Sequence, residues 1–415
     1  DRGHQLGLHV YASQRMNDNH FNGAQLADLQ TLHHTELTQL RKDHPEWLLG
    51  PDTEEWFALS WNMAVPEVRE NRLQHLREIC QNYTWDGVEL DWQRHPFHFP
   101  DDHAYRLRYV LTDFMRAARE LTYEISQQRG TPFYLAARVA GSIEGCHRIG
   151  YDVERWIKED LIDILIPAGA AGTDPAIEVN AFRSLIADRA IALYPGFDGG
   201  VPGPATGPED EATRHNMRTK ATALQYHQQG ATGIYAFNWH ADRDSKRGLL
   251  SQVGKRETLQ KQNKLYSITH RFRQETGPWR GAYKHDRLRG TLPVALYPTF
   301  KITGPHFTLD LADDLQEFPP QDLTLRFRLQ DWVDGDQVRF LLNDESLIDP
   351  TINYCHHGDS NPISDVSNAA WHNFNIDPAK TPPGSHRIEV ILLNRHPQLA
   401  CDLVLTDIEL VVNYC

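Results

Sequence analysis

Residues 85–94 read Trp-Asp-Gly-Val-Glu-Leu-Asp-Trp-Gln-Arg. After the turn pair Asp86-Gly87, apolar and polar side chains alternate, which is the period-two pattern of a β-strand. The alternation puts Glu89 and Asp91 on one face, roughly 6.5–7 Å apart at the backbone, so each carboxylate can change the pKa of the other. In a parallel barrel both faces of a strand are covered, and these carboxylates would point into the barrel interior or its mouth. The alternative is an edge strand with a wet acidic face.

The chain has 415 residues, which is long for one small core and predicts two domains. Acidic residues outnumber basic ones, 56 against 42, for a formal net charge of -14. We therefore expect no nucleic-acid partner, because such proteins neutralise phosphates with basic side chains. No run of about 18 apolar residues is present, so we expect no membrane span. The chain starts at Asp1 without an apolar leader, so we expect a processed or trimmed form of a secreted or periplasmic protein.

The sequence predicts neither a metal nor another cofactor. Its five cysteines are widely spaced, and an odd, sparse set is not a disulfide framework. Cys355-His356-His357 could begin a metal site, but no second ligand pair follows at a zinc-like spacing. The glycines at 199–207 follow neither a dinucleotide nor a phosphate-loop spacing.

Strands and helices alternate through the first two-thirds of the chain. Strands are expected at residues 6–12, 56–62, 88–92, 133–139, 162–167, 190–195 and 233–239, and helices at 66–83, 104–125, 152–159, 179–187 and 211–229. Near-continuous apolar strands separated by helices indicate a parallel sheet. About seven or eight such units in roughly 260 residues favour an α/β fold of the (β/α)8 TIM-barrel type over an open doubly wound sheet.

After about Gly277 the pattern changes to short strands without helices between them. This is typical of a β-sandwich of jelly-roll type. We therefore expect a barrel catalytic domain over residues 1–275 and a β-sandwich over residues 276–415. The sandwich would be either a sugar-binding accessory domain or a structural brace.

A dense set of polar side chains follows the first expected strand. Arg15, Asn17, Asp18 and His20 fall where a parallel barrel places its active-site loops, so we predict that they bind substrate. Asn62, at the end of the second expected strand, joins them as a candidate.

Four short motifs together resemble the glycosyl hydrolase-like family 10 barrels. They are His44-Pro45-Glu46-Trp47, the stretch 65–70, the stretch 83–91 and the stretch 155–167. The resemblance spans roughly residues 5–245. It implies a TIM-barrel glycoside hydrolase that acts on a polysaccharide or oligosaccharide, and it keeps an aspartate at the position of Asp91.

The stretch Asp86 to Gln93 also resembles the strand-four signature of family 18 chitinases, in which the last acidic position is the general-acid glutamate. Here that position is Gln93. An amide cannot donate a proton to a leaving glycosidic oxygen, so a chitinase mechanism carried by this residue is excluded.

Glycoside hydrolysis needs one protonated carboxyl to release the leaving group and one ionised carboxylate to attack or to activate water. We predict Asp91, at the mouth end of its strand, as one of them. Glu89, one layer deeper, is either the second catalytic acid or a buried carboxylate that is tied to Arg138 or to a neighbouring strand and orients Asp91 without reacting. Other candidates for the partner acid follow predicted strands, namely Asp18, Glu144, Asp174 and Asp198.

Three arginines, Arg15, Arg94 and Arg138, stand at or just past strand ends. They could hold a carboxylate or sulfate of an anionic glycan, or they could neutralise the acidic cluster. At the ends of the last strands, Tyr194, Tyr235, Asn238 and Trp239 are candidates for contact with sugar rings, although the two tyrosines would serve equally as barrel fillers.

A second class of function stays open, because Gln93 replaces an acid. The chain could be a non-catalytic glycan-binding protein that kept the groove of a hydrolase and lost its acid pair. A polysaccharide lyase is a weaker third alternative.

Overall fold

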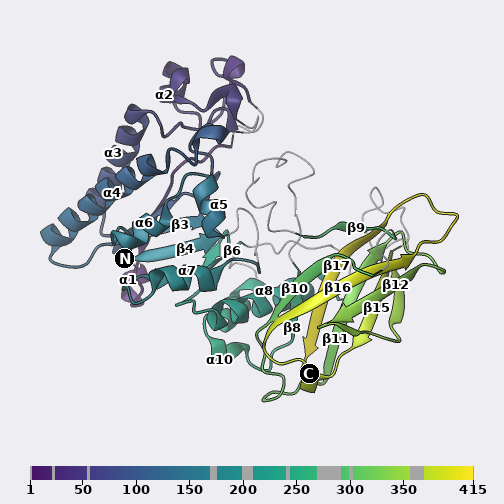
Figure 1. The fold of residues 1–415 in the computed structure, drawn as a ribbon. Coiled ribbons are helices and arrows are strands. Elements are labelled where there is room, and N and C mark those ends of the chain that lie inside the picture. Colours follow the sequence, from purple (N-terminus) through teal and green to yellow (C-terminus); the bar gives the residue numbers. More distant parts are fainter. Residues whose placement is uncertain are drawn as a thin grey trace.

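The computed structural model describes residues 2–20, 24–53, 57–168, 175–198, 209–239, 244–268, 291–298, 302–355 and 369–414. Its N-terminal part holds one parallel sheet with flanking helices, and its C-terminal part holds two antiparallel sheets (Figure 1).

The parallel sheet has the order β1-β2-β3-β4-β6-β7, and a two-residue strand, β5, pairs with β4. Its strands are β1 (Tyr11–Arg15), β2 (Gly87–Asp91), β3 (Tyr134–Ala140), β4 (Ile164–Ala168), β5 (Ala192–Leu193), β6 (Gly196–Asp198) and β7 (Tyr235–Phe237). The sheet is curled, as shown by the contact of Tyr235 on β7 with Glu89 on β2 across its concave side. Since β2 lies between β1 and β3 and all five of its residues are buried, the edge-strand alternative for this stretch is wrong.

The predicted (β/α)8 barrel is wrong. Among the described residues the parallel sheet has seven strands, and no strand joins β7 to β1 to close it. The expected second strand, 56–62, does not form: residues 57–60 make turns, and Trp61 makes only an isolated bridge to Leu48. The apolar run Phe57-Ala58-Leu59 is buried all the same. A buried turn and a buried strand both produce an apolar run in the sequence, so the pattern could not distinguish them.

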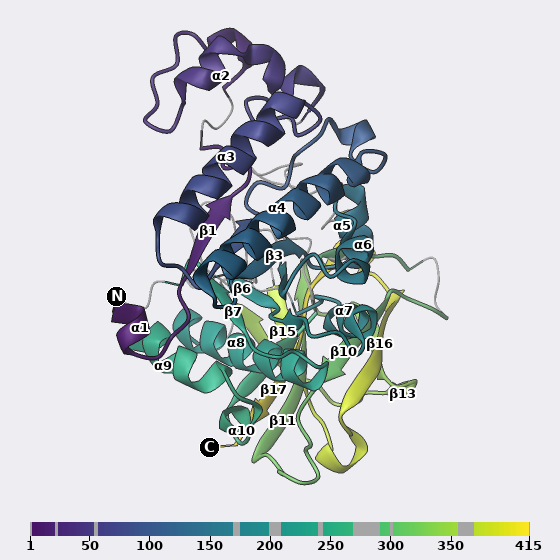
Figure 2. The same ribbon diagram turned by 90° about the vertical axis from the view of Figure 1, so that its left-hand side faces the viewer.

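Helices cover the convex side of this sheet. Two long helices on that side, α3 (Pro66–Asn82) and α4 (Arg108–Arg129), lie side by side (Figure 2). Pro66 occupies the first turn of α3, where no backbone donor is needed. An apolar stripe on α4, including Leu111, Phe114 and Leu121, faces the sheet. The other helices are α1 (Arg2–Gln5), α2 (Gln39–Asp43), α5 (Ile143–Arg148), α6 (Val153–Lys158), α7 (Val179–Ile186), α8 (Glu211–Gln228), α9 (Asp244–Val253) and α10 (Arg256–Leu259).

The turn before β2 requires glycine. A Cβ atom at Gly87 would stand 2.4 Å from Cε1 of Tyr11 and 2.6 Å from the carbonyl oxygen of Tyr134. Both neighbours belong to the strands that flank β2, so a side chain here would force the strands apart. Gly87 therefore fixes the register that brings Glu89 and Asp91 to their places.

The C-terminal strands form two antiparallel sheets, ordered β10-β16-β12-β13 and β14-β15-β11-β17-β8, with β9 also on β17. Aromatic rings join their inner faces, since Phe327 on β11 lies 4.6 Å from Phe340 on β12 between ring centroids. The strands are β8 (Lys264–Ser267), β9 (Val294–Leu296), β10 (His306–Leu311), β11 (Asp322–Gln330), β12 (Gln337–Leu342), β13 (Glu345–Ser346), β14 (Thr351–Cys355), β15 (Ala369–Asn375), β16 (Gly384–Asn394) and β17 (Leu403–Asn413). The first of these, β8, precedes residue 275 and still pairs with β17.

Helix α8 packs between the two parts of the chain. Arg214 and Arg218 on α8 pair with the buried carboxylate of Glu409 on β17, which also accepts a hydrogen bond from Arg326 on β11. In addition, Gln225 donates a hydrogen bond to the carbonyl of Asp310 on β10 at 2.6 Å. None of the helices within the described ranges has the length and apolarity needed to cross a bilayer.

Candidate active site

Two layers of polar side chains meet on the concave side of the curled sheet. Strand register aligns Arg15, Asp91 and Arg138 across β1, β2 and β3. Two residues earlier, the same register aligns Ser13 with Glu89. Parallel pairing thus places the acids of β2 between polar groups of both neighbouring strands.

Asp91 is completely buried, and its two oxygens have different surroundings. Oδ1 accepts hydrogen bonds from the backbone amides of Gln93 at 3.1 Å and Arg94 at 2.9 Å, and from Nη1 of Arg138 at 2.9 Å. Oδ2 has no hydrogen-bond partner among the described residues. The carboxylate is therefore held firmly by one oxygen, while the other is buried without a hydrogen-bond partner among the described residues.

Glu89 is 7% exposed. Its Oε1 accepts hydrogen bonds from the hydroxyls of Tyr235 at 3.0 Å and Ser13 at 3.1 Å. Burial raises the pKa of Glu89, and the negative charge of Asp91 raises it further; the charge of Arg138 and the two hydroxyl donors offset only part of this. Glu89 thus keeps its proton to higher pH than an exposed glutamate does.

Arg138 is 1% exposed and lies over the ring of Phe237 on β7, with Cζ 4.0 Å from the ring centroid. The sequence left open a tie of Glu89 to Arg138 or to a neighbouring strand. Arg138 donates a hydrogen bond to Asp91 and acts on Glu89 through its charge, and Glu89 accepts a hydrogen bond from Ser13 on the neighbouring strand β1. The reason is the register, which puts Arg138 opposite Asp91 and Ala136 opposite Glu89.

The loop after β1 gathers charged groups around Asp18. Oδ2 of Asp18 accepts a hydrogen bond from Arg15 at 2.9 Å, and Oδ1 lies 3.5 Å from Nε of Arg94. Burial alone would raise the pKa of Asp18, but contacts with His95 and Arg15 lower it. His20 accepts a hydrogen bond from Arg94 through Nε2 at 3.0 Å and donates to Glu36 through Nδ1 at 2.6 Å. All three arginines proposed as substrate clamps therefore already face acids or histidines of the chain.

Two groups of side chains within the described ranges are close enough to share a metal ion. One is Asp18, His20 and His95, and the other is His147, Asp152 and Glu154. In the first group the guanidinium groups of Arg15 and Arg94 stand beside the carboxylate. Their positive charge would oppose a divalent cation there.

Two of the three asparagines predicted to bind substrate, Asn17 and Asn62, hold loops. Asn17 is buried, donates to the carbonyls of Trp61 and Phe97, and accepts from the amide of Trp61. Asn62 accepts a hydrogen bond from the amide of Ala64, just before α3. Asn17 thereby fixes the turn that replaces the expected second strand.

The aromatic candidates divide between the two ends of the sheet. The ring of Tyr194 packs against Gly233, just before β7, which is the amino end of that strand. Asn238 and Trp239 follow β7 at its carboxyl end, where Asn238 is exposed with a φ of 47° and Trp239 is half-buried near Phe197.

Of the remaining acidic candidates, only Glu144 has a side chain that the structure describes. Glu144 is exposed on α5 and accepts hydrogen bonds from Arg148. Asp198 ends β6, and Asp174 lies outside the described residues.

Three participants were missed or misjudged in the sequence. Ser13 and Tyr235 are the hydroxyl donors to Glu89. The side-chain amide of Gln93 is buried and has no hydrogen-bond partner among the described residues. Alternation along β1 could have indicated Ser13, which shares a strand face with Arg15. Nothing local in the sequence pairs Tyr235 with Glu89.

No family model and no curated protein matches the chain. Among solved structures it is similar to a cycloisomaltooligosaccharide glucanotransferase of Paenibacillus sp., with 10% identity and a TM-score of 0.30 over 98% of this chain and 46% of that one. It is also similar to a glycoside hydrolase family 18 N-acetylglucosaminidase of Paenibacillus barengoltzii, with 12% identity and a TM-score of 0.35 over 59% of this chain and 99% of that one. A third is a GH36 α-galactosidase of Geobacillus stearothermophilus, with 11% identity and a TM-score of 0.34 over 94% of this chain and 45% of that one.

The chain thus spans less than half the length of two of these three proteins. At these TM-scores the similarity carries no argument about fold or function. The resemblance to glycosyl hydrolase-like family 10 stays a prediction, and the function has to be argued from the residues of the site.

Proposed function

We propose that this chain is a glycoside hydrolase that cleaves a polysaccharide or oligosaccharide with the carboxyl pair Glu89 and Asp91. The observation that carries the proposal is the raised pKa of Glu89 two residues from a carboxylate that is held by Arg138. Neighbouring acids with unequal surroundings are the arrangement that lets one carboxyl donate a proton while the other stays an acceptor.

In this mechanism Glu89 donates its proton to the glycosidic oxygen as the bond between that oxygen and the sugar carbon breaks. The positive charge that develops on the sugar is stabilised by Asp91, whose Oδ2 has no partner among the described residues. Water then supplies the hydroxyl of the new reducing end and returns a proton to Glu89. Tyr235 and Ser13 orient the acid through its Oε1.

Aromatic groups beside the pair support a sugar ligand. Phe237 and Trp239 lie at and just beyond the carboxyl end of β7, and Tyr235 on the same strand reaches the acid. Rings of this kind stack on the apolar faces of sugars. A polymeric substrate of this class accords with a secreted or periplasmic location.

A second function has an observation in its favour. An amide, Gln93, stands beside the acid pair, and its side chain and Oδ2 of Asp91 are buried without partners among the described residues, so this layer holds polar groups that the protein itself leaves unmatched. A non-catalytic glycan-binding protein is therefore the alternative.

Hydrolysis can be tested by incubating the protein with a panel of neutral and anionic polysaccharides and measuring new reducing ends. We expect product with the wild type and a loss of about 10²–10⁴-fold with Glu89→Gln, the range for removal of a general acid. Glu144→Gln is the matched control, because it removes an exposed acid that the structure places on α5. Binding without product on every glycan would support the alternative and refute hydrolysis.

A further inference from the structure

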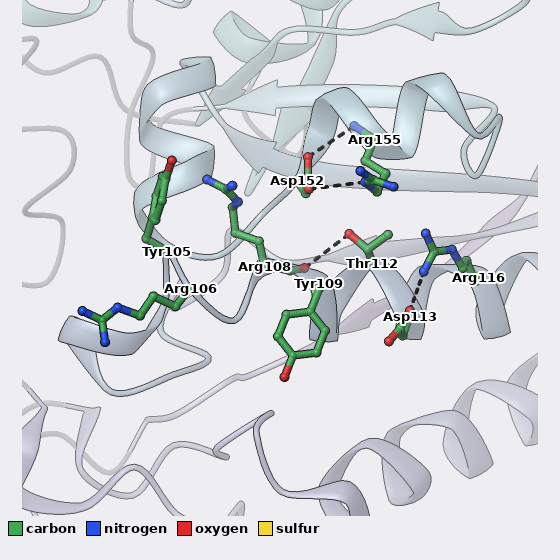
Figure 3. A pocket seen from close by; sticks show the side chains of 9 residues that line it. All are labelled: Tyr105, Arg106, Arg108, Tyr109, Thr112, Asp113, Arg116, Asp152 and Arg155. Carbon is green, nitrogen blue, oxygen red and sulfur yellow. Dashed lines mark hydrogen bonds and ion pairs between the residues drawn. The ribbon is translucent and has the colours of Figure 1, made fainter.

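A cavity of about 390 Å³ lies on the helical side of the N-terminal part, apart from the carboxyl pair. It is formed by the beginning of α4, the residues just before it, and the beginning of α6 (Figure 3). In the chain, α4 comes after β2, and α6 comes after β3. Four arginines line it, namely Arg106, Arg108, Arg116 and Arg155.

Two of these arginines are committed to acids of the chain. Arg116 pairs with Asp113 and makes a bidentate contact with Glu159 at 2.7 Å. Arg155 lies 3.3 Å from Glu159 and 3.8 Å from Asp152. The carboxylates that line the cavity are therefore matched by these cations, as the dashed contacts of Asp113 and Asp152 in Figure 3 indicate.

The other two cations are not matched by acids. Arg106 is exposed and makes no ion pair with a described residue. In Arg108, Nε and Nη1 are shielded from water and have no hydrogen-bond partner within the described ranges. The ring of Tyr105 covers this guanidinium at 3.9 Å but offers no acceptor to its N–H groups. Two buried N–H groups without an acceptor are costly, and an anionic ligand that accepts from them would remove that cost.

Aromatic rings stand beside these cations. Tyr105 is 57% exposed and Tyr109 is 61% exposed, so both rings keep much of their surface open to solvent. The cavity follows the start of a long helix that has no acidic side chain in its first turn, so the helix dipole adds to the positive potential. The chain as a whole carries a net charge of -14, and this positive region is a place on it that attracts anionic ligands.

We propose that this cavity is a secondary binding site for an anionic glycan, with Arg106 and Arg108 holding a sulfate or carboxylate group and Tyr105 and Tyr109 stacking on the sugar rings. The inference rests on the proposed function, since it names the charge class of the glycan. It also assigns the binding of the anionic group to Arg106 and Arg108, because the arginines near Asp91 already face acids or histidines of the protein.

The test compares dextran sulfate with unsulfated dextran at about 0.15 M salt, where long-range charge effects are largely screened. Affinity is measured in the Glu89→Gln background, so that binding is read without cleavage. We expect Arg106→Gln/Arg108→Gln to weaken dextran sulfate binding about tenfold or more, as for the loss of charge-assisted hydrogen bonds. The control Lys255→Gln/Arg256→Gln removes the same charge from exposed positions on and beside α10, and we expect a change of less than about twofold.

Further arms separate the possible ligands. Tyr109→Ser keeps both arginines and should weaken binding of dextran sulfate without changing binding of inorganic sulfate. The glycan assignment is overturned if inorganic sulfate displaces dextran sulfate at an equal concentration of sulfate groups, or if a single-stranded thymidine oligonucleotide binds more tightly. Equal losses in the two double variants would also overturn it. Failure of hydrolysis at Glu89 leaves this binding measurement intact, so the two proposals fail separately.

Discussion

The phenolic oxygen of Tyr235 on β7 lies 3.0 Å from Oε1 of Glu89 on β2, although 146 residues separate them in the chain. Five strands of the sheet order stand from β2 to β7, so the contact exists only because the sheet curls. The hydroxyl donates to the carboxyl whose pKa burial has raised. This single hydrogen bond therefore links the shape of the sheet to the protonation of the proposed acid.

Tyr235→Phe should move the alkaline limb of the activity profile to higher pH. The hydrogen bond from Tyr235 favours the ionised carboxylate and so lowers the pKa of Glu89. Without this hydrogen bond, burial and the charge of Asp91 raise the pKa of Glu89 further, so Glu89 keeps its proton to higher pH. The measurement is kcat/KM against pH, with Tyr194→Phe as the control hydroxyl near the amino end of β7. An alkaline limb at unchanged or lower pH would contradict this account.

Glu89→Gln should stabilise the folded protein at neutral and alkaline pH. The folded-state pKa of Glu89 is raised above its ordinary value of 4.5, so ionisation on raising the pH costs folding free energy. The stability of the wild type is complete below 4.5 and falls as the pH rises through the raised pKa. Glutamine has nearly the same shape as glutamate and does not ionise, so the variant avoids this loss of folding free energy but gives up the catalytic acid.

Thermal unfolding at pH 4 and pH 8 measures the effect. The melting temperature of Glu89→Gln should exceed that of the wild type at pH 8, and the two should converge at pH 4. Glu144→Gln, at an exposed site, should show no such dependence. A variant that is less stable than the wild type at pH 8 would show that Glu89 is held ionised.

The local sequence pattern predicted β2 correctly, but it could not predict whether the sheet closes into a barrel. The alternation from Val88 to Trp92 and the Asp86-Gly87 turn are local, and a strand lies at Gly87–Asp91. Residues 57–61 are as apolar as a strand, but Asn17 fixes their backbone from 44 positions away. Periodicity reports burial and carries no information on such a contact.

The same limit applies to the site. The sequence placed Glu89, Asp91 and Arg138 together, because the ends of neighbouring parallel strands meet. Which acid Arg138 contacts depends on a strand register that has no local signal, and a shift by one residue exchanges the two faces. The cavity at Arg106 and Arg108 had no signal either, since it depends on how α4 and α6 pack.

Arg138→Met should destabilise the protein by about 3–5 kcal/mol, the usual cost of removing one partner from a buried ion pair. Arg138 and Asp91 are both buried and 2.9 Å apart, and Met fills much of the same volume without a charge. The free energy of unfolding, from denaturant titration, is the measurement. Adding Asp91→Asn should recover part of the loss, because the uncompensated carboxylate is then gone.

The control for this prediction is Arg189→Met, which breaks an exposed pair with Asp160 and should cost no more than about 1 kcal/mol. If the double variant is less stable than Arg138→Met alone, then Asp91 does not depend on Arg138 for compensation.

Glu409→Gln should destabilise the contact between α8 and the C-terminal sheets in a pH-dependent way. Glu409 is buried, and burial alone would raise its pKa, but Arg218, Arg326 and Arg214 lower it to about 2. A lowered folded-state pKa stabilises the protein above the ordinary value of 4.5, and this contribution is lost as the pH falls from 4.5 toward 2. In the variant a neutral amide replaces the buried carboxylate, and Glu209 remains as the acid that pairs with Arg214 and Arg326. The free energy of unfolding at pH 7 should therefore drop by about 3–5 kcal/mol, and the difference from the wild type should shrink at pH 3.

Glu345→Gln, at an exposed position on β13, is the control, and its free energy of unfolding should change little at either pH. A loss of equal size at pH 7 and pH 3 would mean that Glu409 acts through packing, because only an ionised carboxylate makes the contribution depend on pH.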